Sequence, residues 1–394
     1  MTSNYKRIGD YIRLVDVRNK DLAVDTLLGL SISKEFIPSV ANTVGTNMAN
    51  YKIINKGQFA CSLMQVRRDK KIPVALQTNF DTAIISQAYP VFEVIDSESL
   101  DPEYLMMWMS RAEFDRHACF LAVGGVRGSL EWDDFCDMEL PVPSIEKQRE
   151  IVREYNVVNG RIALNEQLTK KLEETAQAIY KQWFIDFEFP ISKEYAESIG
   201  KPELKGKPYK SSGGEMTYCE EVGEFKPSIW KSERMINAFE LQRGFDLPRQ
   251  SRKFGSVPIV SANGGTEVHD TAKVTAPGVV TGRSGTLGNV FFIEEDFWPL
   301  NTTLWVKNFK AFTPIYTYFF LSNLNLSEYS TGSAVPTLNR NDVHDDFCVI
   351  PTLVTIGVFD NYIKVLLELI KEKKEEKKVL NKMLTLLNTK MSKA

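Results

Sequence analysis

The sequence predicts an α+β protein in which two mixed α/β domains are separated by two long helices packed as an antiparallel coiled coil. The first observation is an internal repeat: the same residue types recur 208 positions apart for about 60 residues, so that Gly124 matches Gly332 and Asp134 matches Asp342. The second is a long heptad pattern of apolar residues after each copy. A repeat of this length is too long for a solenoid unit and fits a duplicated domain followed by a helix. Two related domains in one chain indicate a target with two halves.

The repeat divides the chain into five segments. We expect a first globular domain at 1–143, a long helix at 144–189, a polar linker at 190–215, a second globular domain at 216–351 and a second long helix at 352–394. The linker is polar and rich in Lys, Pro and Gly, so it could span a wide distance between the two helices.

Each globular domain has the pattern of short strands and turns with one helix. In the first domain, YKIINKGQFACSLM (51–64) and YPVFEVI (89–95) predict strands, and DPEYLMMWMSRAEF (101–114) predicts a helix. In the second domain, strand patterns surround Gly-rich turns at 272–293, and TPIYTYFFLSNL (313–324) predicts the helix. The offset between the two helices is 212 instead of 208, as expected where loops have gained residues.

The two long helices each carry an apolar seam with alternating steps of four and three. The seams comprise positions 151, 155, 158, 162, 165, 169, 172, 176, 179 and 183, and positions 359, 363, 366, 370, 373, 377, 380, 384, 387 and 391. A seam kept over more than four heptads predicts a packed helix pair, whereas a single amphipathic surface helix is the alternative for either segment alone. Both seams are polar at the centre, with Asn165 and Thr169 in one and Lys373 and Lys377 in the other. In an antiparallel pair these layers meet and would fix the register at some cost in stability. About 40 residues at about 1.5 Å each make a helix of about 60 Å.

Composition excludes several classes of protein. Hydrophobic residues make up 43% and charged residues 25%, which is ordinary for a globular chain. Five scattered cysteines without a CxxC pair, and the lack of a long apolar run or signal-peptide core, predict a cytoplasmic protein with reduced thiols. A net charge of −3 argues against DNA binding through bulk charge alone. Local fields decide binding, however, and four cations surround Asp69 in the short run 67–71.

The sequence offers no catalytic or metal-binding set. The three histidines, His117, His269 and His344, are not spaced as metal ligands, and we expect them at the surface or in satisfied hydrogen bonds. There is no phosphate-loop, dinucleotide-binding or nucleophile-elbow motif, and no methyltransferase signature. The run TGRSGTLG (281–288) lacks the lysine of a phosphate loop, so a tight turn between strands is the better interpretation.

Five motifs occur in order in the second domain: QRGFDLP, VPIVSANG, VVTGRSGTLGNV, WPLNTTLWV and AVPTLNRNDV. As a set they closely resemble a target-recognition domain of the type I restriction-modification specificity (S) subunit family. YKQWFIDFEFP followed by KPYKSSGGEM looks like the end of that family's central helix and its linker. The first half is similar through SQAYPVFEV, LDPEYL, FDR, GGVRGSLEWDDF and LPVPSIEKQREIV, so the resemblance covers essentially the whole chain.

The resemblance implies a non-catalytic DNA reader. Each recognition domain would bind one half of a split, asymmetric site in double-stranded DNA, and the helices would set the spacer between the halves. Two methyltransferase (M) subunits would dock on the chain and restriction (R) subunits would join them. S-adenosylmethionine, ATP and Mg²⁺ are then expected on the partner subunits, and no cofactor on this chain.

Candidate site residues follow from side-chain chemistry within this frame. Arginine and lysine read guanine or bind phosphate, and asparagine reads adenine. The DNA-binding candidates are Arg67, Arg68, Lys70, Lys71 and Arg127 in the first domain and Arg243, Asn263, Arg283, Ser284 and Arg340 in the second. For each, a solvated loop charge or a turn residue is the alternative. The partner-docking candidates are Tyr180, Trp183, Phe184 and Phe187, which cover more than one helix face; packing against the chain's own recognition domain is the alternative.

Two other functions stay open at the level of sequence. One is a self-contained DNA methyltransferase or nuclease with a divergent active site. The other is a structural tether that joins proteins through its coiled coil and does not select DNA sequences.

Overall fold

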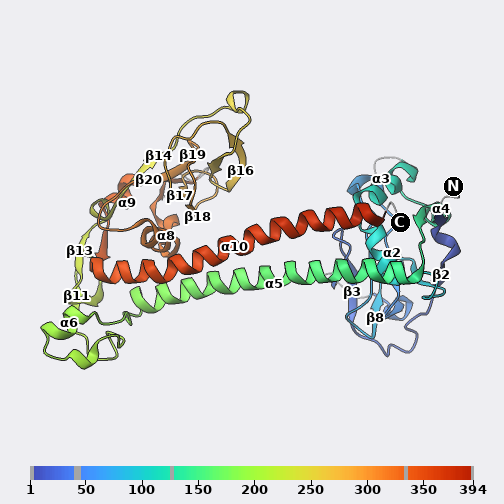
Figure 1. The fold of residues 1–394 in the computed structure, drawn as a ribbon, viewed down its shortest axis with the longest axis horizontal. Helices are drawn as coiled ribbons and strands as arrows, with labels where there is room; N and C mark the ends of the chain where they lie inside the picture. The colour runs from blue at the N-terminus through green and yellow to red at the C-terminus, as the bar shows by residue number, and fades with distance from the viewer. Residues whose placement is uncertain (1–3, 40–45, 125–127, 332–335, 392–394) are drawn as a thin grey trace. The chain divides into compact units, whose positions relative to one another are not determined.

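The computed structural model describes residues 4–39, 46–124, 128–331 and 336–391. Its contacts divide the chain into two compact units (Figure 1). Unit 1 joins residues 1–166 with residues 375–394, and unit 2 is the continuous stretch 167–374. Each unit holds one β-rich domain and one part of the long-helix pair, which confirms the predicted α+β class.

Unit 1 is built on two four-stranded sheets. One is antiparallel and runs in the order β2 (Ile12–Val15), β9 (Val91–Val94), β6 (Phe59–Cys61), β7 (Val74–Leu76). The other has the order β4 (Phe36–Pro38), β3 (Leu27–Leu30), β8 (Thr82–Ile85), β5 (Lys52–Asn55), with β3 and β8 parallel. A short pair, β1 (Tyr5–Arg7) with β10 (Glu139–Pro141), leads into the long helix. The helical elements are η1 (Ile8–Asp10), η2 (Met48–Asn50), α1 (Val66–Asp69), α2 (Pro102–Met109), α3 (Ala112–Leu121) and α4 (Trp132–Asp137).

Aromatic and aliphatic side chains from the antiparallel sheet and α2 to α4 form the core of unit 1. Phe59 and Phe92 stack at 5.0 Å between ring centroids, and Phe135 meets Phe92 edge-on at 5.7 Å. Ile151 and Met391, from the two long helices, are fully buried in the same cluster. The helix ends are therefore part of this core, because burying their apolar side chains stabilises the domain.

Unit 2 repeats this plan with longer strands. Its antiparallel sheet has the order β14 (Phe239–Arg243), β20 (Thr303–Phe309), β17 (Gly278–Gly282), β18 (Val290–Ile293). A second sheet has the order β16 (Gly264–His269), β15 (Val257–Ser261), β19 (Trp298–Pro299), with β15 and β19 parallel. Three short pairs are β11 (Met216–Cys219) with β12 (Glu224–Pro227), β13 (Lys231–Arg234) with β23 (Phe347–Ile350), and β21 (Ser330–Thr331) with β22 (Thr337–Leu338). The helical elements are α6 (Lys193–Ser198), η3 (Pro202–Leu204), α7 (Met235–Ala238), η4 (Arg249–Ser251), α8 (Pro314–Asn323), η5 (Leu326–Tyr329) and α9 (Arg340–Asp345).

The structure extends the duplication beyond the residues that match in sequence. The antiparallel sheets β2-β9-β6-β7 and β14-β20-β17-β18 have the same topology, although their sequences differ. The pairs α4 and α9, and β10 and β23, begin 208 residues apart. Even one ion pair recurs: Arg7 binds Asp137, and Arg234 binds Asp345 at the equivalent place. The gapless part of the repeat is thus the part that anchors each domain to its helix.

The two long helices, α5 (Ile145–Phe184) and α10 (Leu353–Met391), pack through the predicted seam in both units. Every seam position is buried or half-buried, and most neighbouring positions are exposed. In unit 1 Arg161 binds Glu376 at 2.6 Å and Lys377 binds Glu166 at 2.6 Å; in unit 2 Lys374 binds Glu173 at 3.1 Å. Residue numbers rise along one helix as they fall along the other, so the pair is antiparallel in each unit. Within the described residues, no helix is both long and apolar enough to cross a membrane.

Candidate nucleic-acid interface

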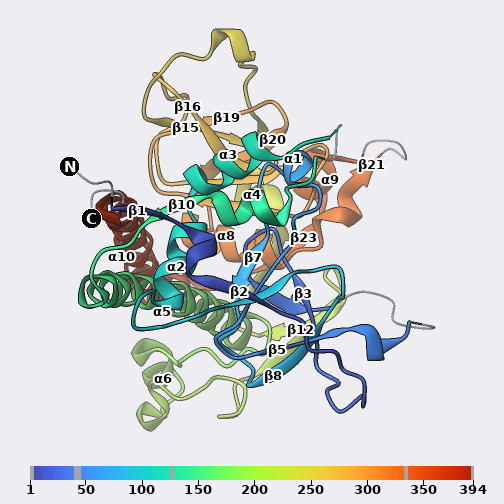
Figure 2. The same cartoon turned by 90° about the vertical axis from the view of Figure 1, so that its right-hand side faces the viewer.

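The basic run of the first domain forms the connection between strands β6 and β7. Arg67 and Arg68 lie on the short helix α1, and Lys70 follows in the left-handed conformation with φ of 53°. These side chains and that of Lys71 are exposed. Helix α1 lies beside α3 (Figure 2). The four cations therefore project from one surface loop of the antiparallel sheet.

Arg67 joins this loop to a second one. Its backbone N–H donates to the carbonyl of Gly128 at 3.4 Å, and its Nη1 donates to the carbonyl of Gly124 at 3.3 Å. Gly128 has φ of +41°, and a Cβ there would come within 2.7 Å of the Arg67 side chain. Because a side chain at position 128 would collide with Arg67, this position in the second loop favours glycine. Arg127, the fifth candidate of this domain, lies outside the described residues.

Arg68 is already engaged with a carboxylate. Its Nε and Nη2 donate to Asp69 at 2.7 and 3.2 Å, which lowers the pKa of the Asp69 carboxyl. The pair is exposed to solvent on the arginine side, so it is weak and can exchange for a phosphate. Lys70 and Lys71 need no such exchange, because both ammonium groups lie at the surface.

Two candidates of the second domain, Arg283 and Ser284, lie in the equivalent connection, between β17 and β18. The connection comprises residues 283–289, so it is longer than the predicted tight turn; Gly285 and Gly288 in it both have φ of +88°, which favours glycine. Arg283 donates its N–H to the carbonyl of Thr302 at 2.8 Å and accepts the N–H of Leu338 at 2.8 Å. Ser284 pairs with Thr337. As in unit 1, the sheet connection is thus joined to the loop that precedes the helix α4 or α9.

Three predicted arginines meet around one cavity in unit 2. The cavity has a volume of about 380 Å³ and is lined by Arg243, Arg283, Leu304, Thr337, Leu338, Asn339, Arg340 and Asn341. The Nε of Arg243 donates a hydrogen bond to the carbonyl of Asn301 at 3.3 Å, which restricts the orientation of the guanidinium group. Three guanidinium groups favour a phosphate or the acceptor edge of guanine, and the two amides add adenine-type donors and acceptors.

Asn263 is not among the residues that line this cavity. It occupies the turn between β15 and β16, where its N–H donates to Ser261 Oγ at 3.3 Å. A Cβ at Gly282 would lie 3.4 Å from the Cβ of Ala262, so this turn is adjacent to the end of strand β17, which precedes Arg283. The structure therefore brings Arg243, Arg283 and Arg340 together at the cavity, whereas Ser284 and Asn263 do not line it.

Equivalent positions of the two domains carry different chemistry. The cavity residues Asn339, Arg340 and Asn341 correspond to Glu131, Trp132 and Asp133 in the 208-residue repeat. A cationic surface in one domain is thus acidic and aromatic in the other. Asn339 and Asn341 were not among the predicted residues, although they flank Arg340 in a recognised motif. Asn339 Oδ1 also accepts the Asn341 N–H at 3.1 Å. In the sequence, an asparagine before a helix is explained by this capping bond, so it does not stand out as a binding residue.

The aromatic cluster at the end of α5 packs within the chain. Tyr180, Trp183 and Phe184 are only 3%, 8% and 7% exposed and contact Phe359 of α10. This favours the alternative interpretation, packing against the second domain, because buried rings offer a partner little surface. Phe187 is half-buried and stacks edge-on against a tryptophan of the same unit, so it too is mainly used internally.

The histidines have structural partners or lie at the surface. His344 Nε2 accepts the Leu241 N–H at 2.8 Å, and His269 Nδ1 accepts the Lys253 N–H at 3.1 Å. His117 is exposed on α3. Among the described residues, no group of three or more His, Cys, Asp or Glu side chains is arranged to hold a metal ion.

No family model matches the chain. Among curated proteins, it is 26% identical over 151 residues to the type I restriction enzyme HindI specificity subunit of Haemophilus influenzae, covering 38% of this chain and 32% of that protein. It is 22% identical over 166 residues to the MjaIX specificity subunit of Methanocaldococcus jannaschii, covering 42% of this chain and 34% of that protein. The matches therefore span about a third of the length of each relative.

Among solved structures, the fold resembles the type I restriction-modification S subunit from M. genitalium with a TM-score of 0.62. That match covers 98% of this chain and 95% of the other at 12% identity, which is a likeness of fold. The chain is thus similar in sequence to two type I specificity subunits over 38% and 42% of its length, and its fold is like that of an S subunit.

Proposed function

We propose that this chain is the non-catalytic DNA-recognition subunit of a type I restriction-modification complex, acting in the cytoplasm. Each domain reads one half of a bipartite, asymmetric site in double-stranded DNA. One observation carries the proposal: the two domains share a topology, yet their equivalent sheet connections hold Arg67 to Lys71 in one and Arg283 and Ser284 in the other. A shared frame with different exposed polar side chains is what two different half-sites require.

The helix pair fits the role of a spacer. Two domains fixed to one packed helix pair would engage a duplex at a set distance and rotation, as dimer geometry does for half-sites. The gapless 208-residue register of the helices and their anchoring strands supports this role, since a change in length would move one domain along the DNA.

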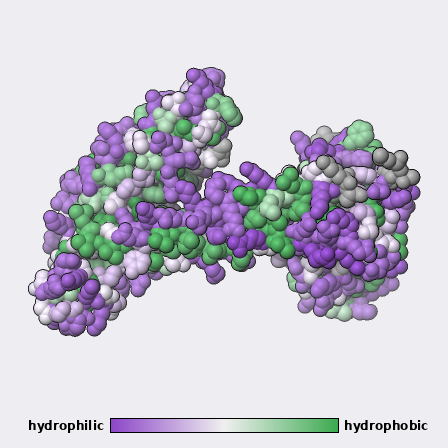
Figure 3. Space-filling model, in the orientation of Figure 1, coloured by the Kyte–Doolittle hydropathy of each residue, from purple (hydrophilic) through white to green (hydrophobic). Residues whose placement is uncertain are grey.

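The partner subunits supply the chemistry in this proposal. Two M subunits bring S-adenosylmethionine and the adenine-methylating site, and R subunits bring ATP-driven translocation and cleavage with Mg²⁺. We place M docking on the exposed apolar face of the helix pair instead of the buried aromatic cluster. In unit 1, Val157 and Leu386 are 72% and 69% exposed and line a groove of about 560 Å³ with Met383. Figure 3 shows apolar patches on the surface of the long helices.

The repeat provides a related face for a second M subunit. In unit 2 the equivalent of Val157 is Val365, also exposed, and Tyr362 lies one turn away. Aspartate at both Val157 and Leu386 should remove one M subunit from the complex, and aspartate at both Tyr362 and Val365 the other. Native mass spectrometry counts the subunits, and two retained M subunits in either variant would contradict this docking.

The decisive test compares the chain alone with the chain plus its M partner. Methylation of genomic DNA should require both, at a bipartite motif that modified-base sequencing defines. Methylation or cleavage by the chain alone would instead support the self-contained enzyme. Binding that falls to non-specific levels in a salt titration of the assembled complex would support the structural tether.

A further inference from the structure

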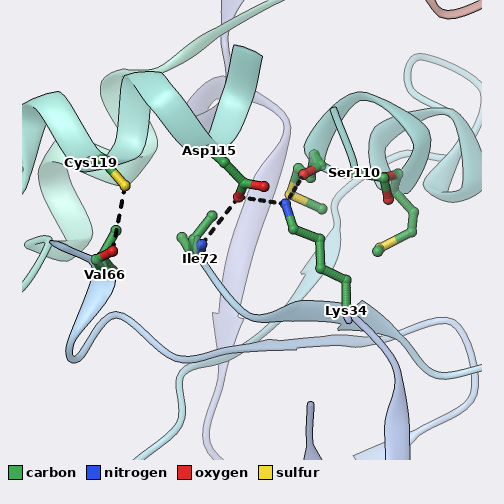
Figure 4. A network of polar contacts seen from close by, with 8 residues as sticks. Lys34, Val66, Ile72, Ser110, Asp115 and Cys119 are labelled. Atoms are coloured by element: carbon green, nitrogen blue, oxygen red, sulfur yellow. Dashed lines mark hydrogen bonds and ion pairs between the residues drawn. The ribbon is translucent and has the colours of Figure 1, made fainter. Parts of the chain in front are cut away.

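Helix α3 holds both ends of the basic loop of unit 1 (Figure 4). At the start of the loop, Cys119 Sγ donates to the carbonyl of Val66 at 3.4 Å. At its end, Asp115 Oδ1 accepts the N–H of Ile72 at 3.1 Å. Asp115 and Cys119 are four residues apart, so they lie on one face of α3. Their two hydrogen bonds attach this face to both ends of the segment that carries the four cations.

Asp115 itself is held by a buried ammonium group. Lys34 Nζ lies 2.7 Å from Asp115 Oδ1, and the two side chains are only 7% and 9% exposed. Lys34 also donates to the carbonyl of Met109 at the end of α2. Its backbone has φ of +67° in the turn between β3 and β4, so a strained turn brings it to this place. Burial lowers the pKa of the Lys34 ammonium, which makes its charge dependent on the carboxylate beside it.

A buried ion pair is not explained by stability alone. Desolvation of two charges offsets much of their attraction, and well-packed apolar residues often serve as well. What an apolar pair could not do is accept the Ile72 N–H, which fixes the backbone directly after Lys71. The equivalent connection in unit 2, residues 283–289, is held by backbone hydrogen bonds to Thr302.

We propose that Asp115, supported by Lys34, is a positioning residue for DNA reading by the first domain: it holds the Lys70 and Lys71 end of the basic loop against α3. This rests on the proposed function of the loop. Loss of the tether should therefore impair one half-site and leave the other intact, whereas a general loss of stability would affect both.

Two matched double variants separate the tether from the charge. Lys34→Met with Asp115→Asn removes both charges but keeps a side-chain oxygen that can accept the Ile72 N–H. Lys34→Met with Asp115→Leu removes the acceptor as well. Each is assembled with M subunits and tested on duplexes carrying the natural bipartite site, or that site with the first or the second half altered. Thermal unfolding of each complex is measured alongside.

The leucine variant should lose about tenfold of its discrimination at the first half-site, the size of one good base contact, with discrimination at the second unchanged. The asparagine variant should stay close to wild type. Cys119→Ala, which loosens only the Val66 end without disturbing the buried charges, should give a smaller loss at the first half-site alone. This third variant keeps the proposal testable if the leucine variant unfolds.

Equal losses at both half-sites, or full discrimination by folded variants that lack the tether, would overturn the positioning role and leave the proposed function standing. A wild-type complex without bipartite specificity would overturn the proposed function, and the positioning role with it.

Discussion

The three arginines around the unit 2 cavity are held to different degrees. Arg243 is steadied by a backbone carbonyl, and Arg283 is half-buried at the start of its turn. Arg340 opens helix α9 and is exposed. An exposed guanidinium beside two amides is free to turn toward a base edge, so Arg340 is the residue whose removal best tests the cavity.

Replacing Arg340 by alanine should weaken binding of the assembled complex by about 1–3 kcal/mol if the side chain reads a base, at one position of the second half-site only. If it binds phosphate instead, the loss should be uniform across sequences and the salt slope should fall by about one. Fluorescence anisotropy at several salt concentrations measures both. Arg234→Ala is the control, because this arginine pairs with Asp345 and does not line the cavity; an equal loss in the control would count against the cavity.

The side-chain carboxyl group of Asp360 on α10 is largely removed from solvent, which disfavours its charged form. Burial raises the pKa of its carboxyl to about 6 from an ordinary 3.8, although a hydrogen bond with Thr313 opposes the shift. One carboxylate oxygen is buried with no hydrogen-bond partner among the described residues. The folded state therefore binds this proton more tightly than the unfolded chain does.

The stabilising contribution of the protonated Asp360 should be fully present below about pH 4 and lost as the pH rises to about 6. Asp360→Asn should flatten this part of the stability profile, measured as the melting temperature between pH 4 and 7. Glu368→Gln, at an exposed position of the same helix, should leave the slope unchanged. A slope that persists in the asparagine variant would show that another group causes it.

The residue types of the binding candidates could be chosen from the sequence, but which of them lie side by side in space could not. The motif AVPTLNRNDV and the run 67–71 pointed to segments in which the structure places exposed cations, Arg340 in one and Arg67, Arg68, Lys70 and Lys71 in the other. Nothing in the sequence placed Arg243 beside Arg340, since they meet only after strands far apart in the chain have paired. The Lys34–Asp115 pair was equally hidden, because its partners are 81 residues apart.

At the scale of elements, the polar layer in the helix pair has a measurable cost. Asn165 is 2% exposed, and its Nδ2 is buried with no hydrogen-bond partner among the described residues. An unsatisfied buried amide costs about 1–3 kcal/mol. Such a residue in a seam fixes the register of two helices, because any shifted pairing would bury it among apolar side chains.

Leucine at position 165 should raise the free energy of unfolding by about 1–2 kcal/mol, since it removes the unsatisfied amide and adds apolar contact. Chemical denaturation of the wild type and the variant measures the change. Gln167→Leu is the matched control, because position 167 is exposed and gains no burial. A destabilised Asn165→Leu variant would mean that the amide is paired by water.

Helices were more predictable than strands for a physical reason. The heptad seam is a local pattern, so the sequence contains both its period and its length. Strand pairing depends on distant partners: β2 pairs with β9, and β3 lies parallel to β8, after long intervening segments. The aromatic cluster on α5 was ambiguous for the same reason, because an apolar face is needed both against Phe359 and against a partner subunit.

At the scale of the whole molecule, the helix pair is where the spacer proposal can be tested. Insertion of one heptad into each helix, between residues 166 and 167 and between 374 and 375, keeps the seam in phase. Seven residues add about 10 Å of helix, close to three base pairs. Modified-base sequencing should show a spacer longer by about three base pairs with both half-sites unchanged. An insertion in α5 alone, which breaks the seam, is the control and should abolish assembly; an unaltered spacer in the double insertion would exclude the helices as its determinant.

The way unit 1 is assembled has a consequence for biosynthesis. Met391, near the end of α10, is fully buried in the core that begins with β1 and β2. Residues 167–374 must be translated before that segment leaves the ribosome, a delay of roughly 10 to 40 s at ordinary elongation rates. Unit 2 is continuous in sequence and can fold during this interval. Until the end of α10 is synthesised, the apolar core of unit 1 lacks Met391 and stays partly exposed to solvent. Chaperones would therefore encounter this protein chiefly through its N-terminal half.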